Sequence, residues 1–229
     1  MKTLILRASL LATALGLAAC AGAPAASSAP VAIPGLPEPL PPPGIDEAGN
    51  PPAPADAFLS AIARHCGQAF AGRVVVDHPA SPDSAFAGKA LVMHVRDCGA
   101  DQVRIPFHVG DDHSRTWVLT RTASGLRLKH DHHHADGSAD AVTMYGGDSA
   151  EAGTAIRQAF PVDAESVAVF TREGLAASVT NTWAMEVEPG KRFLYELSRP
   201  GGRLFQVEFD LSRPVPLPPP AWGSEAAKP

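Results

Sequence analysis

The sequence predicts a mainly β protein in which antiparallel strands form an up-and-down barrel, closed or partly open, with two short helices. Three observations carry this prediction: short runs of alternating apolar and polar residues, turn signals between them at hairpin spacing, and only two segments with a helical period. All of them fall within residues 56–213, which is long enough for one domain with a single core. A barrel removes most sheet edges. A β-sandwich is the alternative, because periodicity does not separate the two architectures.

The two predicted helices cover residues 56–66 and 164–173. In the first, Asp56 serves as the N-cap, and apolar residues follow it at helical spacing. In the second, Asp163 is the N-cap and Gly174 is the stop signal. The rest of the domain is expected to consist mostly of strands and turns.

Five short runs follow the first helix at hairpin spacing, at residues 73–76, 89–96, 102–109, 115–122 and 126–133. Segments rich in Gly, Pro, Asp and Ser separate several of them and mark turns. After the fifth run, Asp136 and Gly137 predict a hairpin turn. The chain is then expected to return as a strand over residues 140–145.

The alternation is clearest near the end of the domain, over residues 182–187, 193–198 and 205–211. The sequences EPGK and PGGR turn the chain between these runs. Each run buries one face and leaves the other to water, which is typical of antiparallel sheet. Together with the earlier runs, they predict about eight to ten strands and a barrel of lipocalin-like size.

The N-terminal residues, MKTLILRASLLATALGLAAC, are typical of an export signal. A basic start with Lys2 and Arg7 precedes an apolar run at residues 8–17, too short to span a bilayer, which requires about twenty residues. The ending LAAC resembles the lipobox of bacterial lipoproteins. This resemblance implies that residues 1–19 are removed, that Cys20 carries lipid, and, since Ala21 follows, that the anchor lies in the outer membrane of a Gram-negative bacterium. The alternative is an ordinary signal that ends near a cysteine by chance.

Proline-rich segments flank the domain on both sides. Residues 20–55 and 214–229 cannot form a core, so the first is predicted to be a tether behind the lipid anchor and the second a flexible tail. Removal of the signal with its two basic residues leaves 17 basic and 24 acidic side chains, a net charge of −7. A chain with this charge and no basic run is a poor partner for nucleic acid.

Two cysteines, Cys66 and Cys98, lie within the predicted domain. An exported chain enters an oxidising compartment, so we expect these two residues to form a disulfide. The alternative roles are a thiol nucleophile or a metal ligand, but neither residue lies in a Cys-x-x-Cys or similar setting.

Four of the nine histidines lie in one stretch, KHDHHHADGSAD, at residues 129–140. Side chains alternate along a strand, and His130 and His132 share the parity of two leucines, Leu126 and Leu128. If the leucines face the core, both histidines point toward the barrel interior or its mouth.

This histidine cluster predicts one of two things. His130 and His132 could bind one zinc or copper ion, with His134 and Asp136 among the candidates for further ligands. The alternative is a polar hairpin end, whose rings form hydrogen bonds with each other, with the neighbouring aspartate and with solvent.

Three aromatic residues, Trp117, Trp183 and Tyr195, also have two interpretations. Aromatic side chains at alternating positions usually belong to the core, but they can also line a cavity that holds a small ligand inside a barrel. His108 has the opposite parity from its apolar neighbours and is therefore expected to face solvent.

The sequence contains no nucleophile elbow, no zinc-protease motif and no phosphate-binding glycine loop, so an enzyme is not favoured. Two stretches resemble a family of secreted Gram-negative proteins without an assigned activity: HVGDDHSRTWVLTRTASGLRLKHDHHHADGSADAVTMYGG and ELSRPGGRLFQVEFDL. The resemblance therefore implies no function. We expect an exported, lipid-anchored, non-catalytic protein that binds a small ligand or an envelope partner. Zinc or copper binding is the alternative, and a hydrolase is the least favoured class.

Overall fold

The computed structural model describes residues 51–80 and 84–224. The predicted signal peptide, Cys20 and the tether up to residue 50 lie outside the described residues. The elements are, in chain order, α1 (Pro54–Ala63), β1 (Ala69–His78), β2 (Leu91–His94), β3 (Asp97–Cys98), β4 (Gln102–Val109), β5 (Asp112–Thr122), β6 (Gly125–His132), β7 (Tyr145–Asp148), β8 (Arg157–Pro161), α2 (Ala164–Arg172), the 3-10 helix η1 (Ala176–Thr180), β9 (Thr182–Glu188), β10 (Arg192–Arg199) and β11 (Arg203–Val215).

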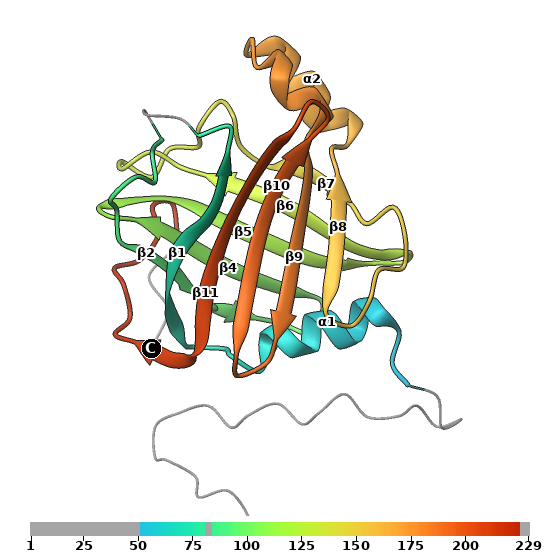
Figure 1. The fold of residues 1–229 in the computed structure, drawn as a ribbon, viewed down its shortest axis with the longest axis vertical. Coiled ribbons are helices and arrows are strands. Elements are labelled where there is room, and N and C mark those ends of the chain that lie inside the picture. Colours follow the sequence, from blue (N-terminus) through green and yellow to red (C-terminus); the bar gives the residue numbers. More distant parts are fainter. Residues whose placement is uncertain (1–50, 81–83, 225–229) are drawn as a thin grey trace, which may run out of the picture. The chain divides into compact units, whose positions relative to one another are not determined.

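The strands form a single antiparallel sheet that curls into a nearly closed barrel (Figure 1). Its order is β7-β6-β5-β4-β2-β1-β11-β10-β9-β8, and the short β3 pairs with β4 outside this path. Neighbours in the sheet are neighbours along the chain, apart from the β2–β4 step and the pairing of β1 with β11. The barrel prediction is therefore confirmed, and one continuous sheet replaces the two packed sheets of a sandwich.

The two end strands, β7 and β8, meet at a seam that lacks a ladder of backbone hydrogen bonds. The Ser166 hydroxyl bridges the seam, because it accepts from the Gly146 N–H at 2.7 Å and donates to the Gly146 carbonyl at 3.1 Å. The Asp163 N–H also donates to this carbonyl, at 2.9 Å. A Cβ on Gly147 would collide with the Pro161 carbonyl, so this glycine permits the close approach. The seam protects strand edges that would otherwise be free to pair with another chain.

Helix α1 lies across the lower end of the barrel in Figure 1, with Phe58, Leu59 and Ile62 buried in the core. A disulfide joins Cys66, just after this helix, to Cys98 in β3, and this confirms the predicted bridge. The helix therefore closes one end of the barrel and is held there by a covalent link.

The start of α1 differs from the prediction, whereas α2 matches it closely. The first helix begins at Pro54 after Ala53, so Asp56 lies in the first turn and is not the N-cap. A proline suits the first helical position, because its missing N–H would have no partner there. In α2, Asp163 is the N-cap as predicted and accepts from the Ser166 N–H at 2.8 Å.

The predicted strand at residues 140–145 is wrong, since only Tyr145 belongs to β7. The preceding residues form a loop in which side chains take backbone hydrogen bonds. The Asp140 carboxylate accepts from the Val142 N–H at 2.7 Å, and the Thr143 hydroxyl accepts from the His132 N–H at 2.7 Å. Such local bonds compete with a strand ladder. The predicted turn at Asp136 and Gly137 is present.

The proline-rich tail was expected to be flexible, but up to residue 224 it packs on the domain. Strand β11 continues to Val215, and the chain then packs on the outside of the barrel. Ala221 is 3% exposed, and the Trp222 N–H donates to the His113 carbonyl at 2.9 Å. The Trp222 ring also contacts the His113 ring edge-on.

His108 was predicted to face solvent, but it is buried. Its Nδ1 lies 2.8 Å from Nδ1 of His113, which the C-terminal segment contacts through Trp222. The strand parity was correct, but a distant part of the chain returns beside this outer face. Burial, followed by the neighbouring histidine, lowers the pKa of His108 to about 4.

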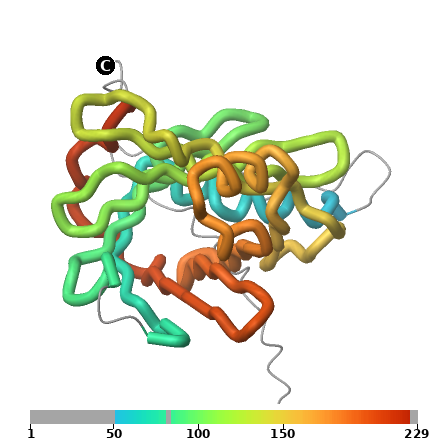
Figure 2. Tube along the Cα trace, turned by 90° about the horizontal axis from the view of Figure 1, so that it is seen from above, coloured from blue at the N-terminus to red at the C-terminus, as the bar shows by residue number. Residues whose placement is uncertain are grey.

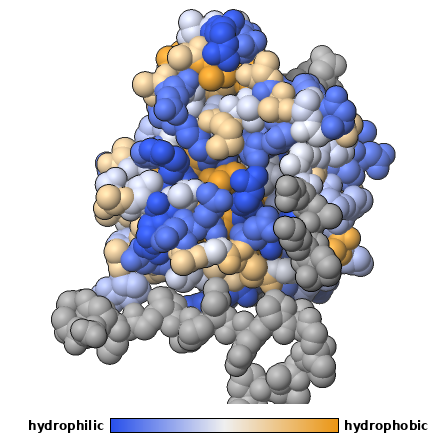
Figure 3. Space-filling view, turned by 180° about the vertical axis from the view of Figure 1, so that it is seen from behind, coloured by the Kyte–Doolittle hydropathy of each residue, from blue (hydrophilic) through white to orange (hydrophobic). Residues whose placement is uncertain are grey.

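The face shown in Figure 3, on the side opposite to that of Figure 1, is mostly hydrophilic, and its hydrophobic residues form small, separate spots. Among residues 51–80 and 84–224, no helix is both long and apolar enough to cross a membrane.

Candidate functional site

A cavity of about 250 Å³ lies inside the barrel, toward the end that is opposite α1. Figure 2 shows this end of the barrel, with α2 and η1 over part of it. Side chains of β4, β5, β6, β7, β9, β10 and β11 form most of the walls. Phe170 of α2, Leu175 and Ser178 near η1, and Phe86 in the β1–β2 connection also line the cavity.

The walls of the cavity are predominantly aromatic. Trp117 lies at the centre, with its ring stacked 4.6 Å from Tyr195 and 4.7 Å from Phe107, measured between centroids. Trp183 lies 5.0 Å from the His130 ring. All three aromatic residues proposed from the sequence, Trp117, Trp183 and Tyr195, are buried and line the cavity. Such rings offer flat apolar surfaces against which a ligand can stack.

His130 lines the cavity as a neutral hydrogen-bonding group. Its Nδ1 lies 3.2 Å from the Tyr145 carbonyl and its Nε2 lies 2.9 Å from the Tyr195 hydroxyl. A carbonyl oxygen only accepts, so Nδ1 carries the proton and Nε2 accepts from Tyr195. Burial, followed by the charge of His132, lowers the pKa of His130 to about 3. The ring is therefore uncharged at neutral pH.

His132 lies nearer the mouth of the cavity and is also neutral. Its Nε2 lies 3.2 Å from the Tyr145 hydroxyl, and burial, followed by the charge of Arg115, lowers its pKa to about 4. Burial raises the pKa of Tyr145 to about 12, so its phenol keeps its proton. The polar groups of this wall therefore provide hydrogen bonds but no charge.

The structure does not bring the four proposed metal ligands together. His130 and His132 face inward as their parity predicted, but His134 and Asp136 are exposed on the following turn. The Asp136 carboxylate accepts from the N–H and the hydroxyl of Ser138, at 2.9 and 2.6 Å. The parity argument fails here because the ladder ends at the bridge between His133 and Ala139. Across the described ranges, no three His, Cys, Asp or Glu side chains are grouped to hold a metal ion.

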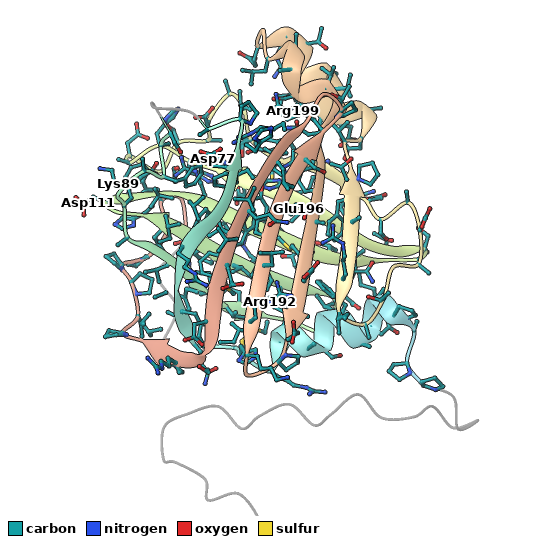
Figure 4. The ribbon with its side chains drawn as sticks, in the orientation of Figure 1. Asp77, Lys89, Asp111, Arg192, Glu196 and Arg199 are labelled. Atoms are coloured by element: carbon teal, nitrogen blue, oxygen red, sulfur yellow. A yellow bond between two sulfur atoms is a disulfide. The ribbon has the colours of Figure 1, made fainter. Side chains whose placement is uncertain are left out.

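Three arginines that the sequence analysis did not identify also line the cavity. Arg115 forms an ion pair with Asp112 at 2.6 Å, and Arg203 forms one with Asp77 at 2.5 Å. The Arg199 side chain forms no ion pair or hydrogen bond with the described residues, and its Nε is buried without a partner. Figure 4 shows Arg199 near the α2 end of β10, at the same end of the barrel as Asp77.

Strand parity could have revealed these arginines. Arg115 is two residues before Trp117, and Arg199 continues the inward series that includes Tyr195. Arg203 pairs directly with Arg199 across the β10–β11 turn. Charged residues next to a turn are usually interpreted as solvent-facing, and this hides their inward parity.

Chemically, the site combines flat apolar walls with a few fixed polar groups, the composition that is typical of small-molecule pockets. Ser178 also lines the cavity, but within the described part of the chain its hydroxyl forms no hydrogen bond with either histidine.

Comparisons of this chain with protein-family models, with curated proteins and with solved structures found no match. The sequence resemblances to lipoprotein signals and to a secreted family stay predictions.

Proposed function

We propose that this protein is a non-catalytic binding protein that holds a small, largely apolar molecule in the barrel cavity. One observation carries the proposal: a cavity of about 250 Å³ is lined by eight aromatic residues and several fixed polar groups. Pockets for small molecules commonly measure about 300–1,000 Å³ and have mainly apolar walls. The volume lies just below this range, which favours a compact ligand over a long chain.

Burial of apolar surface would provide most of the affinity. Removing apolar surface from water contributes about 25 cal/mol per Å², and stacking on an aromatic ring adds about 0.5–1.5 kcal/mol. The bond between Tyr195 and His130, and those that Tyr145 forms with both histidines, fix ring positions before a ligand arrives. A pocket that is already ordered loses little conformational entropy on binding.

Blocking the cavity from η1 is expected to weaken binding. In the Ser178→Trp variant, an indole would occupy part of the cavity, which Ser178 lines. We expect the affinity for naphthylmethanol, an uncharged probe, to fall at least about tenfold, or 1.4 kcal/mol. Isothermal titration calorimetry on the lipid-free mature chain, residues 21–229, measures this change.

The matched control is Ala177→Trp, which places the same side chain on the same 3-10 helix but at an exposed position outside the cavity lining. This variant is expected to bind as the wild type does. Equal effects of the two substitutions, or no binding by the wild type, would contradict the proposal.

We further propose that the domain is exported and anchored to the outer membrane by lipid on Cys20, with residues 21–55 as the tether. The support is the signal sequence, its lipobox-like ending and the proline content of the segment that follows. A polyproline-like tether extends about 3.1 Å per residue, so it would hold the domain well away from the membrane surface.

Lipidation is expected to depend on Cys20 alone. Cells that express the Cys20→Ala variant should show no incorporation of radioactive palmitate into this protein, whereas the wild type should be labelled. A Cys66→Ala/Cys98→Ala variant is the matched control, because it removes cysteines without touching the signal. Persistent labelling of Cys20→Ala would refute the anchor.

A further inference from the structure

Arg199 is a cation of the cavity lining without a counterion. Within the part of the chain that the structure describes, it forms no ion pair, and its Nε is buried without a hydrogen-bond acceptor. Leaving a buried donor without a partner is unfavourable, and more so when the group is charged. Folding therefore leaves a hydrogen-bonding capacity unused at this position.

The rest of the lining does not balance this charge. Among the described residues, the cavity is lined by three arginines and by no aspartate or glutamate. The carboxylates nearest to the other two arginines, Asp112 and Asp77, are already paired with Arg115 and Arg203. The two cavity histidines are neutral. The mouth of the cavity therefore carries an excess of positive charge.

The environment of Arg199 disfavours an isolated cation. Burial, followed by the positive charge of Arg203, lowers the pKa of Arg199 below its ordinary value. A bound anion would offset both effects, and a guanidinium matches the planar, two-oxygen geometry of a carboxylate.

A second lining residue also keeps a free polar atom. Asn181 is 5% exposed, and its Oδ1 has no hydrogen-bond partner among the described residues. Native proteins satisfy most buried polar side-chain atoms, so an exception beside a cavity indicates a group that a ligand or water satisfies. An amide oxygen accepts, so this atom would take a hydrogen bond from a donor on the ligand or from water, whereas the Arg199 Nε–H would donate to the ligand.

We propose that the ligand of this cavity is a small organic anion with a flat apolar body, whose negative group binds Arg199 at the mouth. This inference rests on the proposed binding function and specifies its ligand class. The body of the ligand stacks among the rings around Trp117, and its anionic group stays near the β10–β11 turn. Arg203 and Arg115 add positive potential while their own aspartates hold them in place.

Two probes with the same ring system test the charge preference. Naphthoate carries a carboxylate, and naphthylmethanol carries a neutral hydroxymethyl group at the same position. We expect the wild-type mature chain to bind naphthoate at least about tenfold more tightly at neutral pH and low salt, as measured by calorimetry. The ratio of the two affinities is the readout, because it is insensitive to changes in the apolar walls.

Substitutions assign the preference to Arg199. In Arg199→Gln, the affinity ratio is expected to fall to near one, whereas Arg199→Lys, which keeps the charge, should still favour naphthoate. Arg213→Gln is the matched control, since it removes the same charge from an exposed position of β11 outside the cavity lining. It should keep the wild-type ratio.

The outcomes separate this inference from the proposed function. Wild-type protein that binds both probes equally would overturn the anion preference but leave the binding function standing. Failure to bind either probe would overturn both. If Arg199→Gln keeps the wild-type ratio, or weakens both probes to the same extent, then Arg199 is not the anion-binding group.

Discussion

Reduction of the disulfide between Cys66 and Cys98 is expected to lower the stability of the domain by about 3–4 kcal/mol, the chain-entropy value for a closed loop of this length. The two cysteines are 32 residues apart in sequence. The loop that they close contains β1 and β2, which complete the barrel between β4 and β11. In a domain of this size, the change corresponds to a fall in melting temperature of roughly 10 °C.

Thermal melts with and without reductant, followed by circular dichroism, measure this effect on the mature chain. The Cys66→Ala/Cys98→Ala variant should melt near the reduced wild type and should not respond to reductant. The expectation fails if the melting temperature of the wild type is the same with and without reductant, although alkylation shows that both thiols of the reduced protein are free.

Substitution of Gly147 by alanine is expected to destabilise the barrel by about 3 kcal/mol, at the upper end of the range for overpacked sites. Its added Cβ would collide with the Pro161 carbonyl, which is a backbone atom that a rotamer change cannot move. The strands at the seam would have to separate, and the contacts between Ser166 and Gly146 would weaken.

The matched control is Gly99→Ala, because neither glycine has a positive φ and the added Cβ at Gly99 would lie 3.6 Å from the nearest atom, an ordinary contact. Urea unfolding should place Gly99→Ala within about 0.5 kcal/mol of the wild type. Similar values for the two variants would contradict this account of the seam.

The sequence predicted those parts of the fold that depend on local patterns. Alternation identified the meander at residues 182–211, and Asp163 and Gly174 marked the ends of α2. Parity also placed His130 and His132 on the inner face. These features follow from side-chain period and capping, which are properties of neighbouring residues.

The seam and the tail could not be predicted in this way. Gly146 and Gly147 have no side chains, so β7 shows little alternation of apolar residues. The α2 residue that contacts β7 at the seam, Ser166, follows later in the chain. His108 is buried beside His113, which is contacted by Trp222, a residue more than a hundred positions later in the chain. Both outcomes depend on long-range packing, which local periodicity does not encode.

The candidate site was predicted only in part. Trp117, Trp183 and Tyr195 were proposed as cavity residues, and they line the cavity. The volume of the cavity could not be predicted, because it depends on how the whole barrel closes. Arg199 was missed although its parity matches that of Tyr195, because a charged residue beside a turn resembles an exposed one. Parity did not extend to His134 and Asp136, which are exposed beyond the point where the ladder ends.

The measurement that tests the binding cavity most directly is an NMR titration of the mature chain with naphthylmethanol, following the indole N–H signals of its three tryptophans. Trp117 and Trp183 line the cavity, whereas Trp222 lies outside the lining, against His113. The account predicts that the Trp117 and Trp183 signals shift in a saturable way while the Trp222 signal stays in place. Signals that do not move, or a shift of Trp222 alone, would contradict it.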